Sequence, residues 1–568
     1  MISESADRES FKSFIKSKEK TAFLYPVLIV CVWLIVYLLC TVLWDQKIGW
    51  DENSYLTTAK GIATDFDFSS RTTTPLGTIK YAFPQHTHHY PIYSTYIAIF
   101  FKLFGISIPV AYFSTWLSAL CACLFIYFTM LLVTENSRLF SFLTAITFLF
   151  LPRVVDYCDS AMMEIPGSGL LMIFTYFIFK DISKGKVNPF LIGLAAAWLY
   201  LYKSLFIGAV FGFIALILCA YKSKRIGLNI QSKFNYSTSL SIYLGVIAVI
   251  YFIFTKLIFL PLAPMMNFDR RTELLGTYAD FAAGFFHDPI NNALLNLNGF
   301  WTGVIVHYFP SIPTIFIPNN EGFFNTSPGW FEFGLFFVFV FYMTVFFFIS
   351  FKKLLPLQRL VILFTIVSIF SLNLIFNLIA ASCLGVRCRY NLLYLPLLLI
   401  SIAILLWVNR DYFTPFFKGP IIRNVFLLWS FLLILYVPFY LGGLQVAQWN
   451  KDLYHNIAHK NSEIVRKFIG NLNPQFIYFH AGQHTNWDLY PTRVIIMDMS
   501  TDQLKLINKK LPKPIDFLFL QPENQLFQES QNLIMKGQPI IDNAYSYYGV
   551  DPENKVVVYK SNESYRGN

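Results

Sequence analysis

The chain has 568 residues, of which 55% are hydrophobic and 14% charged, and its mean hydropathy is +0.51. This composition excludes an ordinary soluble enzyme. The net charge of +11 does not indicate nucleic acid as a partner, because the basic residues fall in short segments between long apolar runs. The sequence therefore predicts an all-α polytopic membrane protein that is surrounded by membrane lipids.

Basic residues also set the predicted orientation. Residues 1–22 are rich in Lys and Arg and directly precede the first apolar run, at 23–43, which places the N-terminus in the cytoplasm and the next loop outside. The apolar run at 92–104 is only about 13 residues long, short for a membrane crossing, and we expect a juxtamembrane helix at the external surface there. With that segment not crossing, nearly every later basic cluster falls in the cytoplasm, and the chain has about eleven spans.

This layout divides the chain into three parts. A cytoplasmic N-terminus at 1–22 precedes a transmembrane domain at 23–441, whose long external loops are 44–108 and 261–328. Residues 442–568 instead alternate short apolar runs with polar helical patterns. The alternation predicts a small α/β domain, which the number of crossings places outside the cytoplasm.

An acidic pair stands near the start of the first external loop. Asp51 and Glu52 follow the first apolar run, and Tyr55, Ala59 and Gly61 come after them. Such a pair alone is common in solvated loops, but further charged residues fall on the same predicted side of the membrane. These are Asp156, Asp159 and Glu164 in the second external loop, Lys203 at the end of the fifth span, and Arg387 and Arg389 before the tenth.

These residue types fit the transfer of a sugar from a lipid phosphate. An acceptor hydroxyl loses a proton as it attacks the anomeric carbon, which calls for a carboxylate as general base. The phosphate leaves with developing negative charge, which Lys or Arg stabilises. We therefore predict Asp51 as the base and Glu52 as the residue that orients or binds the acceptor. Lys203 and Arg389 are the predicted ligands of the donor phosphate.

The acidic loop resembles the first external loop of the GT-C glycosyltransferases, most closely that of the protein O-mannosyltransferases and the aminoarabinose transferases of lipid A. Two later patterns extend the resemblance. The apolar, Gly-containing helix that ends at Lys203 resembles the family's fifth-span pattern. Arg389 and Tyr390, followed by Pro396, resemble its late-span pattern.

The resemblance implies the GT-C fold, a polyprenyl- or dolichyl-phosphate sugar as donor, and a lipid, glycan or protein as acceptor. It also implies inversion at the anomeric carbon and a second acidic residue after a span-ending proline. Glu164 fits that position better than Asp159 or Asp156, although an Asp is commoner there. Further residues complete the predicted site: Arg387 and Tyr390 for the donor phosphate, and Tyr55, His88 and His89 for the acceptor cleft.

No cofactor is firmly implied. His88 and His89 stand close enough in the sequence to share a divalent metal, but no Cys or acidic ligand follows at a defined spacing. A bacterial inner membrane with the active site facing the periplasm is the predicted location, with a luminal site in the endoplasmic reticulum membrane as the alternative.

Two other functions stay open on the sequence alone. An O-antigen ligase or polymerase would be organised around a large late external loop with Arg and His. A transporter or flippase of lipid-linked sugars would carry charges inside its spans and repeated halves. The early acidic loop, the position of the charges at span ends and the absence of a visible repeat favour the glycosyltransferase.

Overall fold

The computed structural model describes residues 23–41, 50–68, 72–73, 92–184, 187–202, 207–226, 347–379, 391–411, 452–480, 489–495, 498–511 and 513–562, with a few short pieces between 245 and 345. Most of them are helical. Within these ranges, three helices are long and apolar enough to cross a membrane: Phe23–Thr41, α5 (Ile108–Val133) and α8 (Glu164–Lys184).

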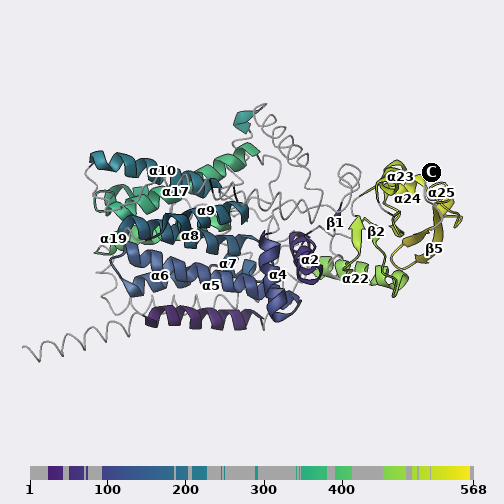
Figure 1. The fold of residues 1–568 in the computed structure, drawn as a ribbon, viewed down its shortest axis with the longest axis horizontal. Helices are drawn as coiled ribbons and strands as arrows, with labels where there is room; N and C mark the ends of the chain where they lie inside the picture. The colour runs from purple at the N-terminus through teal and green to yellow at the C-terminus, as the bar shows by residue number, and fades with distance from the viewer. Residues whose placement is uncertain are drawn as a thin grey trace, which may run out of the picture.

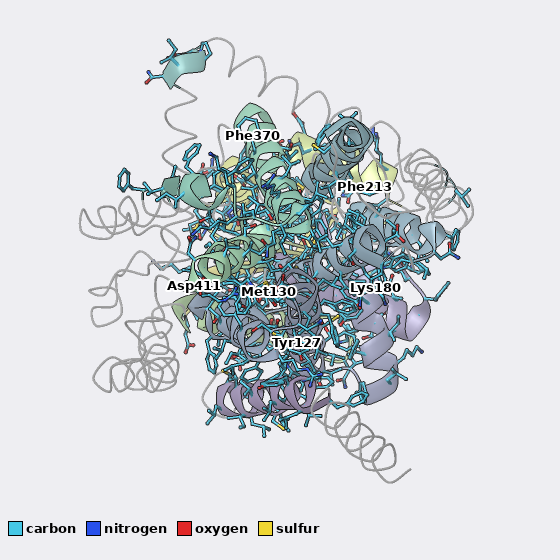
Figure 2. The ribbon with its side chains drawn as sticks, turned by 90° about the vertical axis from the view of Figure 1, so that its left-hand side faces the viewer. Tyr127, Met130, Lys180, Phe213, Phe370 and Asp411 are labelled. Atoms are coloured by element: carbon cyan, nitrogen blue, oxygen red, sulfur yellow. The ribbon has the colours of Figure 1, made fainter. Side chains whose placement is uncertain are left out.

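Further helices lie alongside these three and complete a bundle (Figure 1). They are α6 (Arg138–Phe150), α9 (Pro189–Tyr202), α10 (Ile207–Ile226), α17 (Pro356–Ile379) and α19 (Leu395–Val408). Their sequences are apolar around much of the helix because the bundle has a buried interior and an apolar outer surface. Seen from the end at which Lys180 of α8 lies, the helices stand side by side (Figure 2).

Small residues allow the central helices of the bundle to approach closely. α5 packs against both α6 and α8, and α10 packs against α17. At Gly169 of α8, an added Cβ atom would lie 2.9 Å from the carbonyl oxygen of Ser118 in α5, so a larger residue would force the two helices apart. Close contact at small residues is the usual basis of helix association in a membrane.

Two helices lie across one end of the bundle instead of along it (Figure 1). They are α2 (Trp50–Asp65) and α4 (Ile92–Phe104), which pack against each other. Both helices fall within the predicted first external loop, 44–108. Of the two, α2 has 16 residues and carries the acidic pair in its first turn.

Beyond this end of the bundle lies a mixed sheet of six strands (Figure 1). Its order is β1-β3-β2-β4-β6-β5, in which β1, β3, β2 and β4 are parallel to one another and β6 and β5 are antiparallel. The strands are β1 (Thr72–Thr73), β2 (Phe476–Phe479), β3 (Arg493–Ile495), β4 (Phe517–Leu520), β5 (Tyr545–Asp551) and β6 (Val556–Ser561). Five of the six come from residues 452–562, so we call this part the C-terminal sheet.

Helices accompany the strands of the C-terminal sheet. They are α22 (Asp452–Ile469), α23 (Thr501–Lys510), α24 (Gln525–Glu529) and α25 (Gln531–Ile534). Strands β2 and β4 are apolar at every position because both faces of the sheet are covered. A small sheet with accompanying helices is thus present in this part of the chain, whereas β1, contributed by the predicted first external loop, was not predicted.

Candidate functional site

Glu52 connects the first external loop to the second. It lies in the first turn of α2 and is buried, with 5% of its surface exposed. Its Oε1 accepts a hydrogen bond of 2.5 Å from the backbone N–H of Ala161, a buried residue between α7 (Pro152–Cys158) and α8. An acidic side chain in the first turn is also favoured by the helix dipole. The carboxylate thus joins two segments that are 109 residues apart in the sequence.

Asp51, the predicted base, occupies the same turn of α2. Its backbone belongs to the helix, while its side chain lies outside the part of the chain that the structure describes. The same holds for Asp156, whose backbone belongs to α7. The structure therefore places the acidic pair on an ordered helix at the end of the bundle, with Glu52 as the member whose contacts are described.

Three tyrosines, one of them from α2 itself, pack together at this end of the helix. The ring of Tyr93, from α4, lies between Tyr55 of α2 and Tyr202 of α9, with ring centroids 5.2 Å and 5.8 Å apart and edge-on geometry in both pairs. All three side chains are buried. The hydroxyl of Tyr202 donates a hydrogen bond of 3.1 Å to the carbonyl oxygen of Met163, directly before α8. Tyr55, predicted in the acceptor cleft, is thus part of a packed cluster.

Glu164 belongs to the same cluster. It is the first residue of α8 and is 1% exposed. Glu52 and Glu164 are both close enough to Tyr93 to interact with it electrostatically, and Glu164 also interacts with Tyr202. The structure therefore brings together the acid of the first loop and the predicted second acid.

Asp159 lies nearby but has a different setting. Its Oδ1 accepts a hydrogen bond of 2.7 Å from the indole Nε1 of Trp116 in α5. The carbonyl oxygen of Trp116 in turn accepts one of 2.7 Å from the indole of Trp33. The next residue, Ser160, is tied to α5 through its carbonyl oxygen, which accepts a bond of 2.9 Å from Thr115. Asp159 therefore fastens the predicted second external loop to the bundle, and, like Glu52, it is close enough to Tyr112 to interact with it electrostatically.

The other predicted site residues lie outside the described residues: Lys203, Arg387, Arg389, Tyr390, His88 and His89. Two of their described neighbours can be placed. Tyr202 contacts the start of α8, as described above. The short helix η3 (Asn391–Tyr394) packs against α8, where Ser168 donates a hydrogen bond of 3.5 Å to the carbonyl oxygen of Leu393. Both neighbours thus lie near the first turns of α8.

Within the described part of the chain, no group of three or more His, Cys, Asp or Glu side chains is arranged to hold a metal ion. The tyrosines of the cluster were mostly missed by sequence reasoning. Tyr93 and Tyr202 are two of 33 tyrosines, and no pattern in the sequence distinguishes them from the others. Only their position, next to the His-rich segment and next to Lys203, could have drawn attention to them.

Comparison with solved structures identifies the fold. The structure of ArnT from Cupriavidus metallidurans bound to undecaprenyl phosphate matches with a TM-score of 0.52 at 12% sequence identity, over 96% of this chain and 100% of that chain. The oligosaccharyltransferase of Archaeoglobus fulgidus in complex with Zn and sulfate matches with a TM-score of 0.50 at 13% identity, over 94% of this chain and 73% of that chain. Both are of the GT-C type. The chain has the GT-C fold.

No protein-family model matches the sequence, and no curated protein matches it. The resemblance seen in the sequence is therefore confirmed at the level of the GT-C fold, and the chain is a membrane protein with a mostly helical bundle and a small sheet. The count of about eleven spans remains a prediction that rests on the positions of basic residues.

Proposed function

We propose that this GT-C protein is a membrane glycosyltransferase that moves a sugar from a polyprenyl-phosphate donor to an acceptor outside the cytoplasm. The observation that carries the proposal is the pair of buried carboxylates, Glu52 and Glu164, gathered with Tyr93 at one end of the bundle. Burying a carboxylate is costly unless it is paired or hydrogen-bonded, and buried ionisable groups in a membrane protein indicate a functional site. The bound undecaprenyl phosphate in the ArnT structure supports the class of donor.

The proposed reaction is a single displacement. The oxygen of the acceptor hydroxyl forms a bond to the anomeric carbon, and the bond from that carbon to the phosphate oxygen breaks with its electrons leaving on the polyprenyl phosphate. The proton of the hydroxyl passes to a carboxylate. Asp51 is the proposed base. The carboxylate of Glu52 already accepts the Ala161 N–H, so we assign Glu52 to orienting or binding the acceptor.

The donor phosphate is assigned to the three predicted basic residues and one tyrosine. Lys203, Arg387, Arg389 and Tyr390 are the proposed ligands, and Tyr55, His88 and His89 are assigned to the acceptor cleft. The described neighbours Tyr202 and Leu393, which contact the first turns of α8, support this assignment. Lys and Arg are suited to the charge that develops on the leaving phosphate.

We assign the protein to a bacterial inner membrane with this site facing the periplasm. The ends of α8 support the orientation: Glu164 stands in its first turn and Lys184 in its last. Basic residues accumulate on the cytoplasmic side of a membrane protein. Residues 442–568 then form an extracytoplasmic α/β domain beside the site.

The test is transfer from labelled polyprenyl-phosphate sugars in membranes that contain the full chain. We expect Asp51→Asn to lower the rate of transfer by roughly 10²- to 10⁴-fold, the range for losing a general base. Asp542→Asn is a matched control, because Asp542 is an exposed residue paired with Lys505 in the C-terminal sheet. Transfer that survives Asp51→Asn would move the base role to Glu164 or Asp159. A folded wild-type protein that transfers from none of the donors would contradict the proposal and favour transport of lipid-linked sugars.

A further inference from the structure

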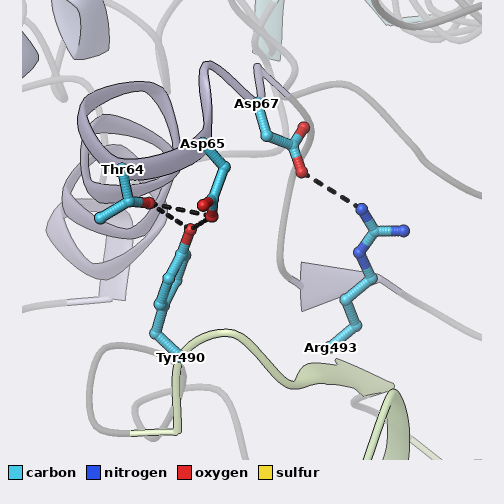
Figure 3. Close-up of polar contacts among 5 residues, drawn as sticks. All are labelled: Thr64, Asp65, Asp67, Tyr490 and Arg493. Atoms are coloured by element: carbon cyan, nitrogen blue, oxygen red, sulfur yellow. Dashed lines mark hydrogen bonds and ion pairs between the residues drawn. The ribbon is translucent and has the colours of Figure 1, made fainter.

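The end of α2 that lies away from the acidic pair is bound to the C-terminal sheet (Figure 3). The hydroxyl of Tyr490 lies 2.6 Å from Thr64 Oγ1 and donates a hydrogen bond to the carboxylate of Asp65. Thr64 also donates a bond of 2.9 Å to that carboxylate, which closes a three-membered polar network. The ammonium group of Lys60, one turn earlier, lies 5.1 Å from the centre of the Tyr490 ring.

A second contact lies just beyond the helix. Arg493 Nη2 stands 3.4 Å from Asp67 Oδ2, and the two side chains are only 14% and 24% exposed (Figure 3). Next along the chain, Thr72 and Thr73 form β1, which pairs in parallel with Val494 and Ile495 of β3. The predicted first external loop therefore contributes an edge strand to the C-terminal sheet, and its side chains also form polar contacts with residues next to that sheet.

The residues on the sheet side of these contacts are firmly held. Leu489, next to Tyr490, is buried in the core of the C-terminal sheet. Thr492 donates a side-chain hydrogen bond of 3.0 Å to the carbonyl oxygen of Pro474, and the backbone N–H of Arg493 donates one of 3.0 Å to Gln475. Tyr490 and Arg493 thus project from a fixed part of the sheet.

The bundle side is equally well held. Leu56, Ala59, Ile62 and Ala63 of α2 are buried in the core of the bundle. The first turn of the helix is tied to the second external loop by Glu52. A helix of 16 residues is about 24 Å long and behaves as a stiff rod. Its position is therefore set at both ends, and a shift at one end moves the other.

We propose that Tyr490 and Arg493 are positioning residues for the transfer reaction. They hold the C-terminal end of α2 against the C-terminal sheet. Because the helix is rigid, this contact also sets the position of its first turn, which carries Asp51 and Glu52. We call the contacts of Tyr490 and Arg493 with Lys60, Thr64, Asp65 and Asp67 the α2 latch. The proposal rests on the proposed function, because it assigns the C-terminal sheet a role in holding the same site.

The test uses two readouts on the full chain in lipid nanodiscs: amide hydrogen exchange over residues 50–65, and kcat and KM for transfer. Tyr490→Phe removes the hydroxyl but keeps the ring beside Lys60. Arg493→Glu places a carboxylate opposite Asp67, and the double variant Asp67→Arg, Arg493→Glu restores an ion pair with the charges exchanged. Lys505→Glu is the control, because it breaks an ion pair of 2.7 Å within the C-terminal sheet and away from α2.

We expect Arg493→Glu to raise exchange over 50–65 and to lower kcat by about tenfold or more, since misplacing catalytic groups by ~1 Å costs up to about 10²-fold. The KM for the lipid donor should change little, because no residue of the α2 latch is among the proposed donor ligands. Tyr490→Phe should act in the same direction but less strongly. The exchanged pair should recover most of the loss, and Lys505→Glu should behave as the wild type.

Unchanged exchange over 50–65 in both Tyr490→Phe and Arg493→Glu would overturn the latch. Raised exchange with an unaltered kcat would overturn the positioning role while leaving the contact in place. If the wild type transfers from no donor, the proposed function fails, and exchange over 50–65 alone then decides whether the latch holds α2. Tyr490→Phe removes one oxygen atom, so it keeps the test valid should Arg493→Glu fail to fold.

Discussion

The bundle and the C-terminal sheet each bury a carboxylate, but they satisfy it in different ways. Asp551, 2% exposed, takes a backbone N–H from Asn554 at 3.2 Å, three residues further on, and pairs with Lys467 at 3.4 Å. Glu52 takes its N–H from Ala161, 109 residues away. In the first arrangement, the side chain of Asp551 accepts a hydrogen bond from the turn that follows β5, so the contact is local in the sequence. The second holds two loops together at the proposed site, so we expect the two carboxylates to differ in what their loss affects.

Within this comparison of the two regions, the largest expected effect is that Glu52→Gln slows transfer. The amide oxygen can still accept the Ala161 N–H, so the fold is kept while the charge is lost. We expect the rate of transfer to fall about 100-fold, as for the loss of one precisely placed polar group at a reacting centre. The measurement is the initial rate in nanodiscs, with a thermal melt of the same sample.

The same change in the sheet, Asp551→Asn, is the control for Glu52→Gln, and it should leave the rate of transfer within about twofold because distant sites act independently. The contrary result would be that Glu52→Gln lowers the melting temperature and leaves the rate of transfer per folded molecule unchanged. That result would show that Glu52, like Asp551, has a purely structural role. The comparison between the two regions would then fail.

A second prediction separates the two acids of the second external loop. Glu164→Gln should lower the rate of transfer by about tenfold or more, since Glu164 lies in the cluster with Tyr93 and Tyr202. Asp159→Ala should mainly lower stability, by about 1–3 kcal/mol, because the indole N–H of Trp116 loses its acceptor. Rates and melting curves of the two variants decide between these roles, and a reversed pattern would make Asp159 the second acid.

The smallest expected effect is the pH dependence of the C-terminal sheet. Burial by itself raises the pKa of Asp551, but the hydrogen bonds from Asn554 and the charge of Lys467 outweigh it and hold that pKa below its ordinary value of 3.8. A carboxyl whose pKa is lower in the folded state adds stability above its unfolded pKa, and this stability is lost as the pH falls through the folded value. Because Lys467 is largely exposed, the gain is at most about 1 kcal/mol.

Hydrogen exchange of β5 and β6 checks this, with wild type and Asp551→Asn compared at each pH. The protection of the wild type should exceed that of the variant by a constant ratio above about pH 5. The ratio should shrink toward one in more acidic buffer. A ratio that grows on acidification would mean that the pKa of Asp551 is raised instead, and Asp551 would then resemble an acid of the bundle.

Some parts of the molecule could be predicted from the sequence because they follow from local composition. Apolar runs define the helices of the bundle, and apolar runs such as 476–479 and 517–520 define strands that are covered on both faces. α2 was missed because its sequence mixes polar and apolar residues on all sides, which matches a helix wedged between the bundle and the C-terminal sheet. β1 has two residues, too few to give any alternation.

The acidic residues of the candidate site could be selected from the sequence, but their spatial arrangement could not. The grouping of Glu52 with Glu164, and the different hydrogen-bond partners of Glu52 and Asp159, depend on tertiary contacts such as those to Ala161 and Trp116. No local pattern encodes such contacts. The α2 latch could not be predicted from the sequence either, because Tyr490 and Arg493 contact residues about 426 positions earlier in the chain, and only the tertiary structure brings them together.

The edge position of β1 has a consequence for biosynthesis. Thr64 and Tyr490 are 426 residues apart, so at about 5–20 residues per second the ribosome needs roughly 20–85 s to make the second after the first. During that interval α2 can pack on the bundle, but its far end and β1 have no sheet to join. The latch therefore closes among the last events of maturation, and on the proposed mechanism a nascent chain becomes active only when almost all of it has been made.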